Sequence, residues 1–306
     1  MKSALLVVLT ALLFRLILAA FSGLGIDESY MVAASSHFAA SYFDHPLASW
    51  WLELGARHLF GSAAPIVVRL PFVLLSGVAS WLLYLVTARL YGVKAAFWAV
   101  LAYSLSPVFS LAFGSWVLPD GPLNTALLAV LYALIRALGL PEGKPAPRWW
   151  LAAGLFAGLA MLSKYSAALV LVGAALGVLL DKVGRRELAR PWPWLGVVLA
   201  LALFAPVVVW NAQHHWASFG YQGGRAEGVR IRPLMPLSIW AGRRCSCCPG
   251  SGRRWSGCSF VLFWPVRRRG SPGCWAGRRS FRCCYLPWSG FGPPPIFCFT
   301  GPHPAI

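Results

Sequence analysis

The chain has 306 residues, of which 58% are hydrophobic and only 12% are charged, whereas a soluble domain carries about 25% charged residues. This deficit argues against a soluble globular protein and predicts a polytopic membrane protein. A formal net charge of +18 is typical of proteins that bind nucleic acid or an anionic surface. Its distribution argues against that function, because all nine acidic residues lie before position 228 and ten arginines follow Pro233.

Apolar runs of about membrane-spanning length recur over the first 210 residues. The first covers residues 4–21 and follows Lys2, so a cleaved signal peptide is the alternative interpretation. Arg15 inside this run is costly in lipid, and we expect it to face other helices or to reach toward the interface. Two of the seven predicted spans, residues 149–163 and 166–180, are short for crossing a membrane, which suggests that they are tilted or partly shielded by protein. The six further spans are residues 65–87, 95–113, 121–138, 149–163, 166–180 and 194–210.

Residues 25–62 form a long polar loop between the first two spans. Aromatic and small apolar residues recur in it at helical spacing, which predicts a short interfacial helix over residues 29–42. Pro46 suits the first turn of a second helix, with Asp44 near its N-cap. We therefore expect two short helices lying at the membrane surface.

The basic residues indicate which way the spans run. With the N-terminus inside, ten cations fall on the inner side of the seven spans, and acidic residues gather in the outer loops. Polar groups near membrane depth are expensive and usually functional, so we expect one site on the outer side. The outer polar residues are Asp27, Glu28, Asp44, His45, Asp120, Lys164, Asn211, His214 and His215.

Six short motifs follow one another along the outer side of this topology. They are Asp27-Glu28-Ser-Tyr, Tyr42-Phe-Asp-His-Pro46, Val68-Arg-Leu-Pro71, Pro119-Asp-Gly-Pro122, Leu162-Ser-Lys-Tyr165 and Trp210-Asn-Ala-Gln-His-His-Trp216. In these motifs the chain resembles the bacterial glycosyltransferases related to the dolichyl-phosphate-mannose protein mannosyltransferases and the lipid A aminoarabinose transferase, glycosyltransferase family 39. The resemblance covers roughly residues 1–230. It departs from the family at Leu47, where a second proline is common, and in lacking the family's later spans.

The resemblance implies an all-α, polytopic transmembrane bundle of the GT-C kind, with short interfacial helices in a large first outer loop. It further implies inverting transfer of a sugar from a polyprenyl-phosphate donor to a hydroxyl of a lipid, glycan or protein, on the outer face of the inner (plasma) membrane. A nucleotide-sugar donor is disfavoured, since the chain has no soluble domain and no GxGxxG after a strand. The alternatives are a transporter or lipid flippase, which needs internal repeats or mid-span charges, and a non-catalytic assembly factor.

Three carboxylates are candidates for the chemistry. Asp27 is the predicted general base that takes the acceptor proton, the role proposed for the matching residue of the family, and it is also suited to capping the interfacial helix. Glu28 is expected to support it, or else to be a solvated interfacial charge. Asp120 is expected to orient the acceptor or assist the base, or else to cap the fourth span.

Four residues are candidates for the donor phosphate. Asp44 and His45 are predicted to hold a divalent metal cation, which would offset the phosphate charge. Their alternative is an N-cap and an interfacial histidine. Arg69 and Lys164, near the outer ends of spans, suit a lipid phosphate, with snorkelling to the interface as the alternative.

The remaining polar residues have weaker assignments. Asn211 and His214 are predicted to contact donor or acceptor, together with His215, and an interfacial loop is the alternative. His37 is expected to line the interface only.

Residues 233–306 break the pattern, since they are rich in Arg, Cys, Gly and Pro without helical or strand periodicity, and they hold all eight cysteines. We interpret them as a frameshifted segment without a defined fold, following an incomplete transmembrane domain over residues 1–232. A zinc site at Cys245 and Cys248 and an RNA-binding segment are the alternatives. Because the spans that would close the donor cavity are absent, we expect the chain as written to be inactive.

Overall fold

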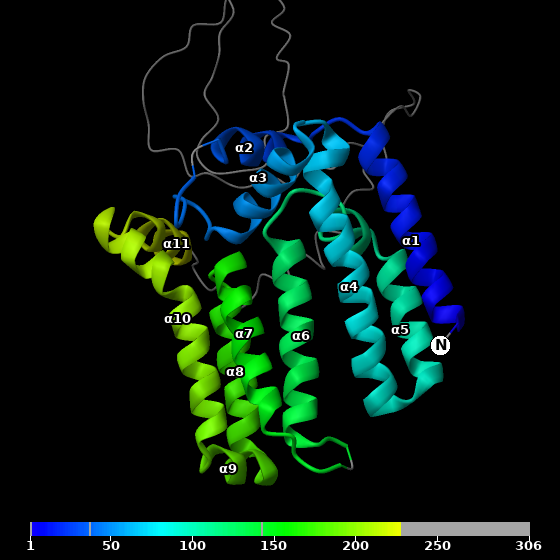
Figure 1. Ribbon diagram of the computed structural model, residues 1–306, viewed down its shortest axis with the longest axis vertical. Helices are drawn as coiled ribbons and strands as arrows, with labels where there is room; N and C mark the ends of the chain where they lie inside the picture. The colour runs from blue at the N-terminus through cyan, green and yellow to red at the C-terminus, as the bar shows by residue number, and fades with distance from the viewer. Residues whose placement is uncertain (1, 37, 142, 228–306) are drawn as a thin grey trace, which may run out of the picture. The chain divides into compact units, whose positions relative to one another are not determined.

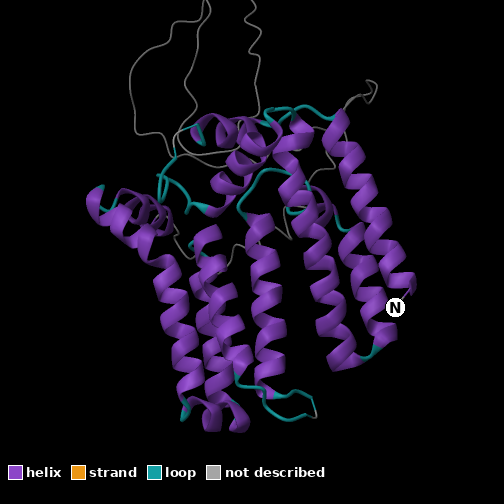
Figure 2. Cartoon of the chain, in the orientation of Figure 1, coloured by secondary structure: helices purple, strands orange, loops and turns teal. Residues whose placement is uncertain are grey.

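The computed structural model describes residues 2–36, 38–141 and 143–227. Within these ranges the chain forms α-helices and one short π-helix joined by loops, without a strand (Figure 2). The prediction of an all-α fold is therefore confirmed. The predictions for His37 and for residues 233–306 lie outside the described residues.

Each predicted span contains a helix of the bundle drawn in Figure 1. In the described part of the chain these helices are α1 (Lys2–Phe21), α4 (Pro65–Tyr91), α5 (Val93–Leu105), α6 (Asp120–Leu138), α7 (Arg148–Ser163), α8 (Ala167–Leu180) and α10 (Pro191–Gln213).

Length separates these helices into two groups. By length and composition α1, α4, α6 and α10 are able to cross a membrane, and α8 becomes a fifth span if α9 (Lys182–Leu188), bent from it by 100°, is counted with it. α5 and α7 have 13 and 16 residues, which at 1.5 Å per residue is about 20 and 24 Å, short of a hydrocarbon core of about 30 Å. The prediction of seven spans is thus confirmed for four or five.

The first predicted interfacial helix begins and ends earlier than expected. α2 covers Ile26–Ala34, with Gly25 as its N-cap, so the predicted range of 29–42 is wrong. Glu28 accepts a hydrogen bond from the Gly25 amide at 2.8 Å, which begins the helix three residues sooner. At the other end the hydroxyls of Ser35 and Ser36 donate to backbone carbonyls one turn back, and such local bonds compete with helix continuation.

The second short helix begins just after Pro46, which was predicted to lie in its first turn. α3 covers Ala48–Phe60, its N-cap is Leu47, and no side chain caps it. The prediction that Asp44 lies at this N-cap is therefore wrong.

The predicted span over residues 95–113 is broken. α5 ends at Leu105, Pro107 follows, and a π-helix, η1 (Val108–Ala112), precedes the loop that leads to α6. Proline disfavours helical geometry in the residue before it, which explains the break. α11 (Ala217–Glu227) completes the described chain.

The helices alternate in direction, so the ends of several elements meet at one end of the bundle. α2 and α3 lie where α1, α7 and α10 end and where α4, α6 and α8 begin (Figure 1). We call this the α2–α3 end. The basic residues predicted on the inner side flank the helices at the opposite end, where α9 lies.

An aromatic cluster supports the α2–α3 end. Trp50 of α3 is fully buried and stacks on Tyr42 with ring centroids 4.4 Å apart. Met31 of α2, Phe72 of α4 and Val117 of the loop before α6 complete its buried core. Burying one such side chain contributes about 1.5–3 kcal/mol, so the cluster holds α2 and α3 firmly against the bundle.

Candidate functional site

The predicted site residues all lie at the α2–α3 end. Asp27 and Glu28 belong to α2, and Asp44 and His45 to the loop before α3. Asp120 begins α6, and Lys164 follows the last residue of α7. Arg69 lies in the second turn of α4, while Asn211 and His214 lie at the end of α10.

Asp27 is the second residue of α2, and its side chain is exposed. Gly25, not Asp27, is the N-cap, so the capping role that the sequence offered for Asp27 is wrong. Among the described residues no hydrogen bond or ion pair engages the Asp27 carboxylate. The first turn of a helix stabilises a negative charge. Asp27 is therefore an accessible carboxylate, held on a rigid helix and able to accept a proton.

Glu28, beside it, is buried and fully paired. Arg69 donates to both of its carboxylate oxygens, from Nε to Oε1 at 2.7 Å and from Nη2 to Oε2 at 2.6 Å. The Val117 amide donates to Oε1 at 3.1 Å, and the Gly25 amide to Oε2. Burial alone raises the pKa of Glu28, but the hydrogen bonds from Arg69, Gly25 and Val117 outweigh it, so the pKa is lowered. The alternative of a solvated charge is wrong; Glu28 is an ionised group that holds the first turn of α2 in place.

Arg69 is not available to a lipid phosphate as predicted. Its guanidinium is buried, and besides Glu28 it donates to the carbonyl oxygens of Ser22 at 2.9 Å and Gly23 at 2.7 Å and to the Ser22 hydroxyl at 2.8 Å. Each of its nitrogens thus has an acceptor inside the chain. Arg69 ties the end of α1, the start of α2 and α4 together. The snorkelling alternative is also wrong, since the side chain is only 1% exposed.

The Glu28–Arg69 pair predicts a specific loss of stability in acid. Because the folded-state pKa of Glu28 is lowered, the stabilisation is complete above the unfolded value of about 4.3 and is lost as pH falls through the lower folded value. We expect the difference in unfolding free energy between the wild type and Glu28→Gln to shrink as pH falls from 7 toward 3. Thermal unfolding in detergent across that range measures it, and a difference independent of pH would contradict the pairing.

Asp120 and Lys164 form an ion pair from two different helices. Lys164 Nζ lies 2.8 Å from Asp120 Oδ1 and 3.0 Å from Oδ2. Both side chains are about one quarter exposed. Pro119 is the N-cap of α6, so the capping alternative for Asp120 is wrong. A partly exposed pair contributes about 0–1 kcal/mol, so a substrate phosphate or hydroxyl can replace either partner at little cost.

Asp44 and His45 lie half-buried in the loop between α2 and α3. Asp44 Oδ1 is buried without a hydrogen-bond partner. Burial, and then the charge and hydrogen bond of the Asp44 carboxylate, raise the pKa of Tyr30 to about 12. No group of three or more His, Cys, Asp or Glu side chains suited to a metal occurs among the described residues. Mg²⁺ is commonly held by one or two carboxylates, waters and substrate phosphates, and the unengaged oxygen of Asp44 fits that pattern.

Asn211 is an internal residue, which disagrees with its prediction as a substrate contact. It is fully buried, its Nδ2 donates to the Val207 carbonyl at 3.0 Å, and its Oδ1 accepts from the Phe219 amide at 3.3 Å. It therefore joins α10 to α11. His214 is exposed, stacks on Trp210 with centroids 4.0 Å apart and bonds that residue's carbonyl. Its contact with donor or acceptor stays a prediction.

Tyr165 lies in this region, although no role was predicted for it from the sequence. Its hydroxyl lies 2.6 Å from Ser218 Oγ, 3.4 Å from Ser41 Oγ and 3.5 Å from Asn211 Nδ2. It thus connects the first loop with α10 and α11. Its place directly after Lys164 in the Leu162-Ser-Lys-Tyr165 motif was the available signal.

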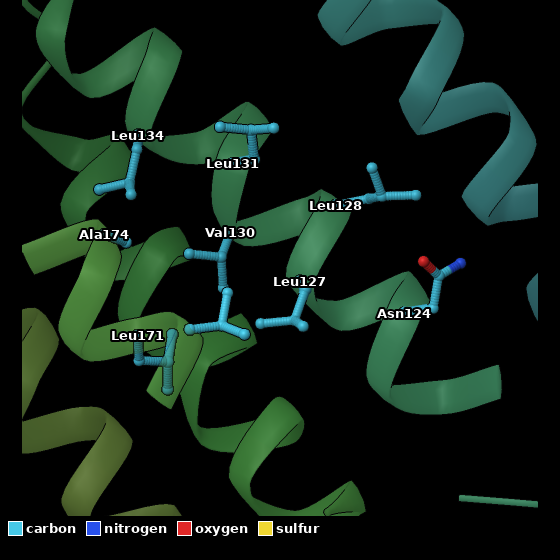
Figure 3. Close-up of a pocket in the computed structure, with 9 residues that line it drawn as sticks. Asn124, Leu127, Leu128, Val130, Leu131, Leu134, Leu171 and Ala174 are labelled. Carbon is cyan, nitrogen blue, oxygen red and sulfur yellow. The ribbon is translucent and has the colours of Figure 1, made fainter. Parts of the chain in front are cut away.

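An apolar groove begins one helical turn after Asp120. Its volume is about 250 Å³. Figure 3 shows its lining from α6 and α8, with Asn124 at one extreme and Leu134 at the other. Ten residues of helix separate these two, a rise of about 15 Å. The groove therefore follows α6 from one turn after Asp120, and its lining is almost entirely apolar. The remaining lining residues are Leu127, Leu128, Val130, Leu131, Val170, Leu171 and Ala174.

Comparison with known proteins agrees with these features. The family model described as dolichyl-phosphate-mannose-protein mannosyltransferase matches residues 44–210, more than half of the chain. No solved structure matches the chain.

Three curated proteins are similar over much of the chain. A lipid A galacturonosyltransferase of Rhizobium johnstonii is 26% identical over 236 residues, covering 72% of this chain and 48% of the relative. An undecaprenyl phosphate-alpha-4-amino-4-deoxy-L-arabinose arabinosyl transferase of Proteus mirabilis is 27% identical over 246 residues, covering 73% and 43%. One of the same description from Shewanella sediminis is 28% identical over 182 residues, covering 59% and 32%. The chain thus spans half or less of the length of these relatives.

Proposed function

Because the chain belongs to the dolichyl-phosphate-mannose-protein mannosyltransferase family, we propose that it is an integral-membrane glycosyltransferase. It moves a sugar from a polyprenyl-phosphate donor to a hydroxyl group of an acceptor, with inversion at the anomeric carbon. The printed names of the relatives favour an undecaprenyl-phosphate donor and a lipid acceptor over a glycan or protein. The site lies on the periplasmic or extracellular side of the inner membrane, with the N-terminus in the cytoplasm.

The observation that carries this proposal is the contrast between Asp27 and Glu28. Glu28 is buried, ionised and held by Arg69, and it fixes the helical turn from which the exposed, unengaged Asp27 projects. Asp27 takes the proton of the acceptor hydroxyl as its oxygen bonds to the anomeric carbon. The bond from that carbon to the phosphate oxygen breaks, and its electron pair leaves with the polyprenyl phosphate. The reaction therefore needs one accessible base and a stabilised phosphate, and no oxidant or reductant.

The donor phosphate lies beside Lys164 in this proposal. Lys164 is partly exposed, and within the described part of the chain the weak pair with Asp120 is its only side-chain partner. It can therefore turn to an incoming phosphate, and Asp120 is then free to orient the acceptor. A divalent cation held by Asp44 and His45 would offset the phosphate charge when bound. The apolar groove between α6 and α8 takes the first isoprene units of the donor.

Filling the groove tests this placement of the donor. We expect Ala174→Phe to raise the KM for a long-chain donor several-fold, because the larger side chain occupies the groove and removes the van der Waals contacts of the isoprene units. A donor of two isoprene units should be affected less. Ala175→Phe, one residue away and outside the groove lining, is the matched control. Equal effects of the two substitutions would argue against the groove as the donor site.

The transporter or flippase alternative has less support. It requires charged groups along a pathway through the membrane, whereas the accessible residues of the candidate site gather at the α2–α3 end. Arg15, the charged residue deep in α1, is fully buried and bonded to other helices, so it is not exposed to a pathway.

Release of sugar from a synthetic polyprenyl-phosphate sugar in membranes tests the proposal. The assay uses the chain with its reading frame restored, since the chain as written is expected to be inactive. We expect turnover that increases with a divalent cation, and no turnover with nucleotide sugars. Transport of the intact lipid-linked sugar without cleavage would support the alternative instead.

A further inference from the structure

Arg15 is a buried cation in the first membrane-spanning helix. It is 0% exposed, and no ion pair engages it among the residues that the structure describes. Its Nε donates to the carbonyl oxygen of Ser110 at 3.2 Å, and its Nη1 to the hydroxyl of Ser76 in α4 at 3.0 Å. The expectation that Arg15 faces other helices is thus confirmed. A charge at this depth is costly and is usually retained for a function.

The main partner of Arg15 is the π-helix η1. Ser110 lies in this element, and its carbonyl oxygen also accepts from the Ser115 hydroxyl at 3.1 Å. π-Turns occur often at functional sites, and a hydrogen bond from a charged donor is stronger than one between neutral groups. Arg15 therefore stabilises the irregular backbone that interrupts the third predicted span.

The chain after η1 packs directly on the guanidinium. A methyl group at Gly114 would lie 2.9 Å from Arg15 Nε and 2.6 Å from the Phe109 carbonyl oxygen. A methyl group at Gly121 would lie 2.7 Å from the Phe113 carbonyl oxygen. Both ends of the loop between η1 and α6 are therefore fixed by close contacts that only glycine permits.

This same loop ends at the candidate site. Val117 is fully buried, and its amide donates to Glu28 Oε1 at 3.1 Å. Asp120 follows three residues later as the first residue of α6. We call residues 108–119 the π-turn segment. It connects Arg15 on one side with Glu28 and Asp120 on the other.

We infer that Arg15 is a positioning residue for the transfer reaction. It holds the π-turn segment, which sets the Val117 amide against Glu28 and places Asp120 beside Lys164. Arg15 lies six residues before the end of α1, about 9 Å along the helix, and it acts through the backbone rather than on the substrate. The effect of Arg15 on the transfer rate rests on the proposed function, whereas its effect on the π-turn segment does not.

Hydrogen–deuterium exchange on the full chain in nanodiscs tests the structural part without requiring activity. Arg15→Met removes the hydrogen-bond donors of the guanidinium and replaces them with an apolar side chain, which is compatible with insertion of α1 into the membrane. We expect the amides of residues 113–118 to exchange at least tenfold faster in this variant, with α10 unchanged. Ser76→Ala is the matched control, since it removes the other partner of Arg15 and leaves the π-turn segment intact. Unchanged exchange in residues 113–118, or an equal increase in α10, would overturn the inference.

The kinetic part compares Arg15→Met, Gly114→Ala and the double variant. We expect each single variant to lower kcat at least tenfold with KM unchanged. The kcat of the double variant should be no lower than that of the more impaired single variant, because both substitutions disturb the same contact between Arg15 and the π-turn segment. Arg15→Lys should recover part of the loss. Additive effects, or a change confined to KM, would overturn the positioning role. If the wild type with its reading frame restored transfers no sugar, the proposed function fails and the exchange experiment alone decides the inference.

Discussion

Replacing Asp27 by asparagine is expected to lower the rate of sugar transfer by about 10²–10⁴-fold, the range that a general base contributes. Asparagine keeps the shape of the side chain but cannot take the acceptor proton. Because Asp27 is exposed and engages no other group in the described part of the chain, membrane insertion and thermal stability should not change. Release of labelled sugar from a polyprenyl-phosphate donor in membranes measures the effect.

Ser29→Ala is the matched control for this substitution. Ser29 is exposed in the same turn of α2, and its hydroxyl has no part in the proposed chemistry, so transfer should continue at the wild-type rate. Asp27→Glu moves the carboxylate by one CH₂ group and should retain part of the activity. Full transfer by Asp27→Asn would remove Asp27 as the base, and a transporter or scaffold would tolerate all three substitutions.

Replacing Arg69 by methionine is expected to destabilise the protein by about 3–5 kcal/mol. The substitution leaves Glu28 buried without its bidentate partner, and breaking a buried ion pair has a cost of that order. It also removes the bonds to the carbonyl oxygens of Ser22 and Gly23. The midpoint of thermal unfolding in detergent, followed by intrinsic tryptophan fluorescence, measures the loss.

Two further variants identify the cause of that loss. Arg69→Met combined with Glu28→Met replaces both charges by apolar groups and should recover a large part of the stability. Lys164→Met breaks the partly exposed pair with Asp120 and should have an effect within about 1 kcal/mol. A loss as large for Lys164→Met as for Arg69→Met would mean that burial does not distinguish the two pairs.

The expected losses of stability for Arg69→Met and Lys164→Met differ because the two ion pairs have different surroundings, although the two cations look alike in the sequence. Arg69 and Lys164 are both cations near the ends of predicted spans, and the sequence assigned both to a lipid phosphate. Arg69 is 1% exposed and has acceptors for each of its nitrogens. Lys164 is more than one quarter exposed, and among the described residues its side chain is paired only with Asp120. Exposure after packing, rather than residue type, decides which cation can meet a substrate.

The sequence alone determined the all-α architecture, the order of the apolar segments and the end of the bundle at which the polar motifs gather. These properties depend on hydrophobicity and charge counted along the chain, which require no knowledge of packing. The family match over residues 44–210 agrees with the motifs recognised there. Element boundaries were less accurate, since local bonds at Gly25, Ser35 and Ser36 set the limits of α2.

Only the tertiary structure decided how the site residues divide into accessible and internal groups. Glu28 and Arg69 are 41 residues apart, and the Val117 amide is 89 residues from Glu28, so no local pattern reports that they meet. The same holds for Asn211, which packing buries, and for Arg15, whose partner Ser110 becomes available only where the π-helix forms. A buried polar group must find its partner inside the fold, and packing between helices determines which partner that is.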